Sequence, residues 1–383
     1  MLLLMQLLAC QGETDTSAVE PTNTLVIVLD TFRHDQVHPD IAPNIHRHAT
    51  ESWWPQSAWA PSPWTIPSLS AFLTGQAPWS LGSPEDHGLP ESAASLPERL
   101  SGYSASMIST NAYVTESRGF AQGFDRFSRV ADDTEAVTLA KKWWASTEGS
   151  PQLLVVQLMT PHLPYEPTTP PESKSERVGD KFWDLDNWDS YQSSIDQAQI
   201  GALYRAQIGD LDAHVGELLD LVGPQTTVAL VSDHGEELFE HGGFEHGHAF
   251  WEEVTRVHAA IRVYGQAPKR PEGLWTLQDV GQQLAFLLNA DDQQKAPGPR
   301  TVVFHGHPLS YRDSVLHQWG IRTETDQYFQ GMRPHQSLGG SFLVPQLEQF
   351  VSALNPPREE TLYLSDDAEE KALQAIGYQV STE

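Results

Sequence analysis

The sequence has little cysteine and few basic residues, and each shortage argues against a class of protein. Cys10 is the one cysteine among 383 residues, so no disulfide can form within the chain and no cysteine-rich zinc site can exist. The 23 lysines and arginines stand against 51 aspartates and glutamates, which gives a formal net charge of −28. Because phosphate contacts need a basic surface, we expect no nucleic-acid partner.

Long hydrophobic runs are also missing. Beyond the N-terminus, no apolar segment reaches the ~20 residues that a membrane-spanning helix requires. The 12 tryptophans, 10 tyrosines and 14 phenylalanines are too many for a disordered acidic chain. The length allows one large domain or two to three small ones, and a sizeable core.

The N-terminal ten residues are apolar and end in Leu-Leu-Ala-Cys, which resembles a bacterial lipobox. The resemblance implies that Cys10 becomes the lipid-bearing first residue, with residues 1–22 as lipoprotein signal and tether. Gln11 favours sorting to the outer membrane, so we expect a lipid-anchored envelope protein that faces the periplasm or the exterior. Because the leader is short and lacks a basic region, an apolar N-terminus without function is the alternative.

Four apolar, β-branched runs predict strands that are buried on both faces of a sheet. They lie at residues 24–29, 105–109, 153–158 and 227–231. Helical periodicity occurs between them, and the alternation predicts an α/β fold with a central, mostly parallel sheet between helices. We expect this domain to fill residues 23–265. Residues 266–273 read as a linker, and 266–383 as a smaller C-terminal part that completes the fold.

Several chemistry-bearing residues stand just past the ends of these runs, where ligands gather in open α/β sheets. They are Asp30, His162, Asp233 and His234. Asp30 taken alone is more typical of a helix cap than of a metal ligand. Thr65 begins a predicted helix that Gly75 closes, so its ordinary role would be an N-cap hydroxyl. The functional alternative uses the same place, because a helix N-terminus stabilises anions.

Seven sets of motifs, in order and with sensible spacing, resemble the sulfatase branch of the alkaline-phosphatase superfamily. They are Val-Leu-Asp-Thr-Phe-Arg (28–33), Pro-Trp-Thr-Ile-Pro-Ser (63–68) with Leu-Thr-Gly (73–75), Gly-Tyr (102–103), Gly-Phe (119–120) with Gly-Phe-Asp (123–125), Thr-Pro-His-Leu-Pro-Tyr (160–165), Ser-Asp-His-Gly-Glu (232–236), and Phe-Glu-His-Gly-His (244–248) with Glu-Glu-Val-Thr-Arg-Val (252–257). The resemblance runs from about residue 23 to 265 and implies an alkaline-phosphatase-like sandwich.

The resemblance also assigns roles. Asp30, Asp233 and His234 match the ligands of one divalent cation, and Thr65 matches the nucleophile, which in many relatives also touches the metal. His162 and His246 match residues that hold the non-bridging oxygens of the ester or assist the leaving group. A mixed oxygen and nitrogen shell suits Mn²⁺ or Zn²⁺ somewhat better than Ca²⁺. The metal's identity is left open.

The departures from the family pattern point from sulfate toward phosphate esters. Sulfatases carry Cys or Ser where Thr65 stands and oxidise it to an aldehyde, which the methyl group of threonine prevents. Leu69 and Thr110 replace a family arginine and lysine, and Thr31 replaces a second metal-binding aspartate. Leu158 stands near where two-metal relatives need a further ligand, so we expect one metal.

We therefore expect a metal-dependent hydrolase, or transferase, of sulfate or phosphate esters that favours phosphoesters. Its substrate would be a small-molecule or envelope ester. Threonine-nucleophile relatives include phosphodiesterases, phosphonate-cleaving enzymes and phosphoglycerol transferases. The alternative is a degenerate member that acts as a non-catalytic binding lipoprotein of the envelope, since Leu69 and Thr110 remove two basic groups. Oligomeric state is left open.

Overall fold

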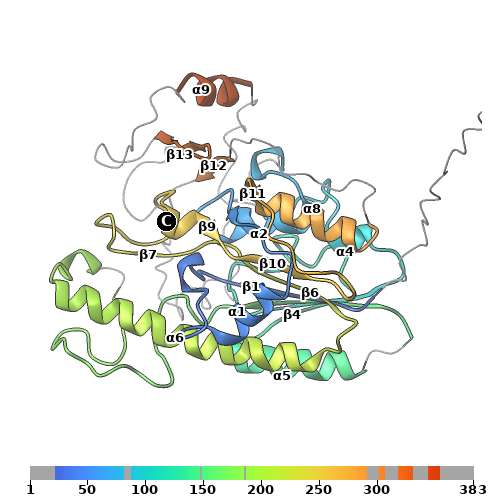
Figure 1. The fold of residues 1–383 in the computed structure, drawn as a ribbon, viewed down its shortest axis with the longest axis horizontal. Coiled ribbons are helices and arrows are strands. Elements are labelled where there is room, and N and C mark those ends of the chain that lie inside the picture. Colours follow the sequence, from blue (N-terminus) through green and yellow to red (C-terminus); the bar gives the residue numbers. More distant parts are fainter. Residues whose placement is uncertain are drawn as a thin grey trace, which may run out of the picture.

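Six strands form the central sheet of the computed structural model, in the order β10-β6-β1-β5-β3-β4 (Figure 1). The strands are β1 (Thr24–Leu29), β3 (Ser104–Ser109), β4 (Arg126–Arg129), β5 (Gln152–Leu158), β6 (Thr227–Ser232) and β10 (Ala259–Arg262). All neighbours pair in parallel except β10, which runs antiparallel to β6. The predicted fold class is confirmed, and the four predicted runs match β1, β3, β5 and β6; β4 and β10 were not predicted.

The structure describes residues 22–81, 88–146, 149–184, 187–290, 302–306, 318–330 and 344–353. Cys10 and the predicted signal and tether, apart from Thr22, lie outside the described residues, as does much of the predicted C-terminal part. Within the described part of the chain, no helix has the length and apolar character needed to cross a bilayer.

Helices cover both faces of the sheet (Figure 1). Alternate side chains of β1 point to opposite faces, as the pleat of a strand requires. Leu25, Ile27 and Leu29 join the apolar cluster of one face, and Val26 and Val28 join that of the other. The first face carries α1 (Pro43–Thr50), α5 (Asp133–Ser146) and α6 (Ser194–Leu221), and the second carries α2 (Thr65–Thr74), α4 (Leu96–Arg99) and α8 (Leu277–Leu287).

Smaller elements surround this sandwich. A second sheet contains β2 (Ser57–Trp59), β9 (Arg256–Val257) and β11 (Leu274–Thr276); β7 (Glu237–Leu238) and β8 (Phe244–Glu245) form a hairpin; and β12 (Val302–Gly306), β13 (Gln318–Arg322) and β14 (Gln327–Gln330) form an antiparallel sheet. The other helices of the described residues are η1 (His34–Gln36), η2 (Pro78–Ser80), η3 (Trp188–Ser190), α7 (Glu252–Thr255) and α9 (Val344–Ala353).

The segment at residues 266–273 is attached to the fold and is not a free linker. The carbonyl of Lys269 accepts a 2.8 Å hydrogen bond from the Trp54 amide, and that of Pro271 accepts one of 2.9 Å from the Gln56 amide. The chain then continues through β11 into α8, whose Val280 lies in the same apolar cluster as Val26 of β1. The core of the sandwich therefore extends beyond residue 265.

Gly281 lets α8 approach α2 closely, and its substitution tests this packing. A Cβ atom at Gly281 would stand 2.0 Å from the carbonyl oxygen of Phe72, which is backbone and cannot rotate away. We expect Gly281→Ala to lower the free energy of unfolding by about 2–3 kcal/mol in urea denaturation. Gly209→Ala is the matched control, because a Cβ there meets nothing within 4 Å and α6 should gain ~0.5–1 kcal/mol. Equal behaviour of the two variants would contradict the close approach.

Candidate metal centre and active site

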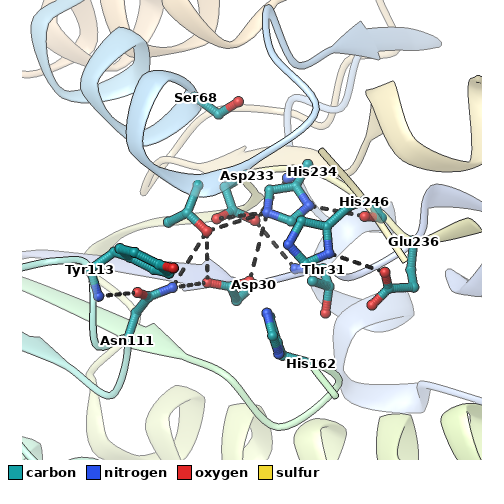
Figure 2. Close-up of polar contacts among 12 residues, drawn as sticks. Asp30, Thr31, Ser68, Asn111, Tyr113, His162, Asp233, His234, Glu236 and His246 are labelled. Carbon is teal, nitrogen blue, oxygen red and sulfur yellow. Dashed lines mark hydrogen bonds and ion pairs between the residues drawn. The ribbon is translucent and has the colours of Figure 1, made fainter. Parts of the chain in front are cut away.

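Asp30, Asp233 and His234 meet at the carboxyl ends of the two central strands β1 and β6 (Figure 2). Leu29 and Ser232 are register partners in these parallel strands, so the residues that follow them are brought side by side. One ligand atom from each of the three residues lies within 4.8 Å of the others, and all three side chains are buried. The structure thus joins the three predicted metal ligands in one cluster.

The inner atoms of this cluster suit a divalent cation. Asp30 Oδ1 and Asp233 Oδ2 are buried and have no hydrogen-bond partner. They lie 3.8 and 3.7 Å from Nε2 of His234. The other ring nitrogen, Nδ1, is 2.9 Å from the Gly235 carbonyl and donates to it, which leaves the Nε2 lone pair facing the carboxylates. Because two unpaired carboxylate oxygens are costly to bury, and two oxygens with one nitrogen suit Mn²⁺ or Zn²⁺, these residues fit the expected metal.

The outer oxygens of the two carboxylates are held in place by hydrogen bonds. Asp233 Oδ1 accepts from the backbone amides of His234, at 2.8 Å, and Thr31, at 3.3 Å. Asp30 Oδ2 accepts from the side-chain amides of Asn111, at 2.6 Å, and Gln157, at 3.1 Å. These bonds fix which oxygen of each carboxylate faces the centre.

In the absence of a cation, burial determines whether the two carboxyls and the imidazole of the cluster carry protons. Burial, with the charge of Asp233 close by, raises the pKa of Asp30 to about 6. Burial also raises the pKa of Asp233 to about 7, against hydrogen bonds from the amides of His234 and Thr31 that lower it. The pKa of His234 is lowered by burial, so its ring is held neutral. In the absence of a metal, the site therefore favours protonated carboxyls.

The hydroxyl of Thr65 lies against the same cluster. Thr65 Oγ1 is 3.3 Å from Asp30 Oδ2, to which it donates, and 3.3 Å from His234 Nε2. Thr65 does not take the alternative role of an N-cap, because it is the first residue of α2 and the cap residue is Trp64, whose backbone is extended. Gly75 closes the helix in a left-handed conformation, as predicted. Asp30 caps no helix either, since its oxygens serve the cluster.

A serine one turn further along α2 offers a second hydroxyl, but it is turned elsewhere. Ser68 Oγ donates a 2.9 Å hydrogen bond to the carbonyl of Ser62. Figure 2 shows its oxygen pointing away from the carboxylates. Thr65 therefore carries the helix hydroxyl that faces the candidate metal centre.

The two further predicted histidines border the cluster. The ring centre of His246 is 4.4 Å from that of His234 and 5.1 Å from that of His162. His162 Nδ1 is 2.6 Å from the carbonyl of Leu163, and His246 Nδ1 is 3.1 Å from Glu236 Oε1. Burial lowers the pKa of both imidazoles. Two neutral rings thus stand beside the space that the carboxylates and Thr65 face.

Three contributors were not predicted: Asn111, Gln157 and Glu236. Gln157 is a polar residue near the end of the buried strand β5, and its Oε1 accepts from Ser109 Oγ at 2.8 Å. Asn111 follows the end of β3 by two residues and also lies 3.4 Å from Thr65 Oγ1. For Gln157, the signal available in the sequence was a side-chain amide that interrupts an apolar run.

The residues that depart from the family pattern have other partners. Leu69 is 1% exposed and lies in the apolar cluster of its sheet face. Thr110 Oγ1 donates to Asp133 at 2.8 Å. Arg33, an arginine close in sequence to Asp30, is committed to Asp35 and Glu240 by contacts of 2.7 and 2.6 Å. The largest influences on the pKa of Asp30 are burial, Asp233, two histidines and Asn111.

The sulfatase family model matches residues 22–290, the part that carries the sandwich and the cluster. The chain belongs to the sulfatase family. This is a family of hydrolases, generally metal-dependent, and the buried Asp30, Asp233 and His234 could hold a metal ion. In sequence, no curated protein matches the chain.

Solved structures show the same fold. A 2-O GAG sulfatase aligns with a TM-score of 0.68 and 16% identity over 91% of this chain and 96% of that one. A protein solved with its substrate D-glucosamine-2-N,6-O-disulfate has a TM-score of 0.65 and 15% identity over 89% and 100%. A phosphonate monoester hydrolase from Silicibacter pomeroyi has a TM-score of 0.63 and 13% identity over 86% and 94%. At such identities the likeness concerns the fold.

The raised pKa of Asp233 predicts how stability depends on pH in the metal-free protein. Because the folded pKa exceeds the ordinary value, the protonated carboxyl stabilises the fold at low pH, and this contribution is lost as pH rises toward and past 7. In chelator at pH 8, Asp233→Asn should therefore unfold with a free energy roughly 2–4 kcal/mol above wild type. The difference should shrink toward pH 5.

Thermal melts of both proteins at both pH values check this prediction. The titration of the histidines affects the two proteins alike, because both contain them, and so does not contribute to the difference in stability. Addition of Mn²⁺ should raise the melting temperature of the wild type and leave the variant nearly unchanged. A difference between the two proteins that does not vary with pH would contradict the assignment.

Proposed function

We propose that the protein hydrolyses monoanionic phosphoesters, such as phosphodiesters or phosphonate monoesters, with Thr65 as nucleophile beside one divalent metal. One observation carries the proposal: Thr65 Oγ1 lies 3.3 Å from both Asp30 Oδ2 and His234 Nε2. This places an alcohol at the start of a helix and against three groups suited to a cation, Mn²⁺ or Zn²⁺ by preference. The arrangement supports nucleophilic attack by a side-chain oxygen.

Asp30, Asp233 and His234 would hold the metal. When bound, the cation would lower the pKa of the nearby hydroxyl and neutralise charge on the phosphoryl group. The chain itself supplies the orientation, since Asn111 and Gln157 keep the outer oxygen of Asp30 engaged. The amide of Asn111 also lies 3.4 Å from Thr65 Oγ1, within reach of an oxygen on the reacting group.

The proposed reaction has two steps. Thr65 Oγ1 gives its proton to Asp30 Oδ2 and attacks phosphorus, so that one O–P bond forms while the bond to the leaving oxygen breaks. The leaving oxygen departs as its anion, stabilised by a hydrogen bond from Nε2–H of the neutral His246, and takes its proton from water, and the chain carries a phosphorylated Thr65. Water then attacks phosphorus and gives one proton to the solvent, while Thr65 leaves with the proton held by Asp30. His162 stands beside His246 and would contact a non-bridging oxygen.

The charge of the site supports a monoanionic substrate. Two carboxylates and one divalent cation sum to zero, and the surrounding histidines are neutral. The charged groups with the largest effect on the pKa of Asp30 are Asp233, His234 and His162, none of them a lysine or arginine. A phosphodiester brings one negative charge to this site, whereas a phosphate monoester brings about two without a cationic side chain to meet the second.

The nucleophile argues for phosphate over sulfate. Thr65 cannot be oxidised to the aldehyde that sulfatases use, because its β-carbon bears a methyl group. One structural relative is named a phosphonate monoester hydrolase and another a 2-O GAG sulfatase, so both classes of ester occur among proteins of this fold. The choice between them rests on the chemistry of residue 65.

A rate panel tests the nucleophile and the substrate class together. We expect Mn²⁺- or Zn²⁺-loaded protein to turn over bis-4-nitrophenyl phosphate and a phosphonate monoester faster than 4-nitrophenyl phosphate or 4-nitrophenyl sulfate. Thr65→Ala should lose roughly 10³-fold or more of this rate, because the attacking oxygen is gone. Chelator should abolish the activity and added metal should restore it.

Thr65→Ser is the matched control, since it keeps the hydroxyl and should retain activity within about tenfold. Mass spectrometry of protein quenched within one turnover should find the phosphoryl adduct on Thr65. A preference for the sulfate, or full activity in Thr65→Ala, would refute the proposal. A product in which the phosphoryl group has been transferred to a second alcohol, and not to water, would identify a transferase.

We further propose that Cys10 carries a lipid that anchors the protein to the bacterial envelope, at the outer membrane and facing the periplasm or the exterior. The Leu-Leu-Ala-Cys motif at residues 7–10 supports this placement. It would put esters of the envelope, or small esters that enter it, within reach of the site.

An alkyne-tagged fatty acid fed to a bacterial host that expresses the full chain tests the anchor. The wild type should acquire the label and partition with membranes, and Cys10→Ser should do neither, because the thiol that accepts the lipid is missing. Label that persists in Cys10→Ser, or a wild type without label, would exclude this anchor.

A further inference from the structure

Glu236 is a fully buried glutamate two residues after the candidate ligand His234. Its Oε1 lies 3.1 Å from Nδ1 of His246, and its Oε2 is buried without a hydrogen-bond partner. Figure 2 shows the carboxyl at the outer side of the His246 ring, with the ring between it and His234. The carboxyl therefore faces His246, and the hydroxyl of Tyr165 is its other polar neighbour.

We propose that Glu236 is a positioning residue that holds the ring of His246 so that its Nε2 faces the reacting ester. This inference deepens the proposed function and rests on it, because His246 is the group that serves the leaving oxygen there. Glu236 itself reaches the reaction only through His246.

The backbone fixes Glu236 independently of His246. Its amide donates a 3.1 Å hydrogen bond to the carbonyl of Glu253, and its own carbonyl accepts one of 3.1 Å from Arg33 Nη1. Arg33 in turn binds the carboxylates of Asp35 and Glu240. A side chain anchored in this way can define the orientation of a neighbouring ring.

The neighbouring residue offers a matched comparison. Glu237 is also fully buried and also contacts a histidine, with Oε2 2.9 Å from His248 Nε2. Its Oε1, however, accepts from the amides of His241 and Gly243 at 3.0 and 2.7 Å, so this carboxylate organises a turn. Glu236 makes no such backbone contacts through its side chain among the described residues. A comparison of variants at the two glutamates therefore distinguishes a positioning role from a structural one.

Without the Glu236 carboxyl, the His246 ring could rotate, and its Nε2 would no longer be held facing the site. Mutation of an outer partner that orients a functional side chain typically lowers activity by about 10–100-fold. A hydrogen bond to a leaving oxygen matters most when the leaving group is a poor one, because more negative charge then develops on that oxygen. The expected signature is therefore a loss of rate that grows as the leaving alcohol becomes less acidic.

The orientation can be read without turnover. Nitrogen-15 spectra of histidine-labelled, Zn²⁺-loaded full chain report the tautomer of each ring, and His246→Asn identifies the signals of His246. We expect one tautomer in the wild type, in Glu236→Gln and in Glu237→Ala, and averaged signals in Glu236→Ala. An unchanged His246 spectrum in Glu236→Ala would overturn the proposal.

The catalytic consequence is read from a series of aryl phosphodiesters with leaving groups from 4-nitrophenol to phenol. Glu236→Ala should lose less than about tenfold in kcat with 4-nitrophenol and ~100-fold with phenol, with little change in KM. Glu236→Gln should restore most of the rate, and Glu237→Ala should change all substrates by the same factor.

Equal losses across the series in Glu236→Ala would overturn the positioning role. If no ester is turned over by the wild type, the proposed function fails instead. In that case the nitrogen-15 spectra alone decide whether Glu236 orients His246.

Discussion

Two carboxylates buried side by side set the requirements of the whole site. Asp30 and Asp233 each present one oxygen that has no partner, next to a neutral imidazole. Like charges in a poorly solvated space repel, so the arrangement is stable either with protons on the carboxyls or with a cation between them. The backbone amides and side-chain amides around the pair bind only the outer oxygens, and this leaves the inner ones free for that cation.

The sequence predicts this centre because the sheet brings its parts together by a simple rule. Strands buried on both faces are read as unbroken apolar runs, and the ends of parallel strands meet at one edge. Asp30 directly follows β1 and Asp233 directly follows β6, so their proximity follows from the two strands being neighbours. Thr65 does not follow a strand of the sheet, so this rule does not predict its place. It was assigned to the site by the resemblance of the motif around it to sulfatases.

Other contributors depend on contacts that no local pattern contains. Gln157 reaches Asp30 because it is the register partner of Val28, and register is decided by the whole sheet. Thr65 is the first residue of α2 and not its cap, because the backbone of Trp64 is extended. The segment at 266–273 is polar and rich in proline, like a linker, yet two of its carbonyls bind amides far away in sequence.

The burial of Leu69 makes a basic side chain at this position hard to accommodate. The resemblance to sulfatases places an arginine at this position, but the side chain here is 1% exposed and packs among the apolar residues between α2 and the sheet. Returning an arginine would bury a guanidinium where nothing receives its five donors. A variant with a formylglycine-forming residue at position 65 would therefore still lack the basic partner of the sulfatase pattern, and a place for that partner would require further substitutions around residue 69.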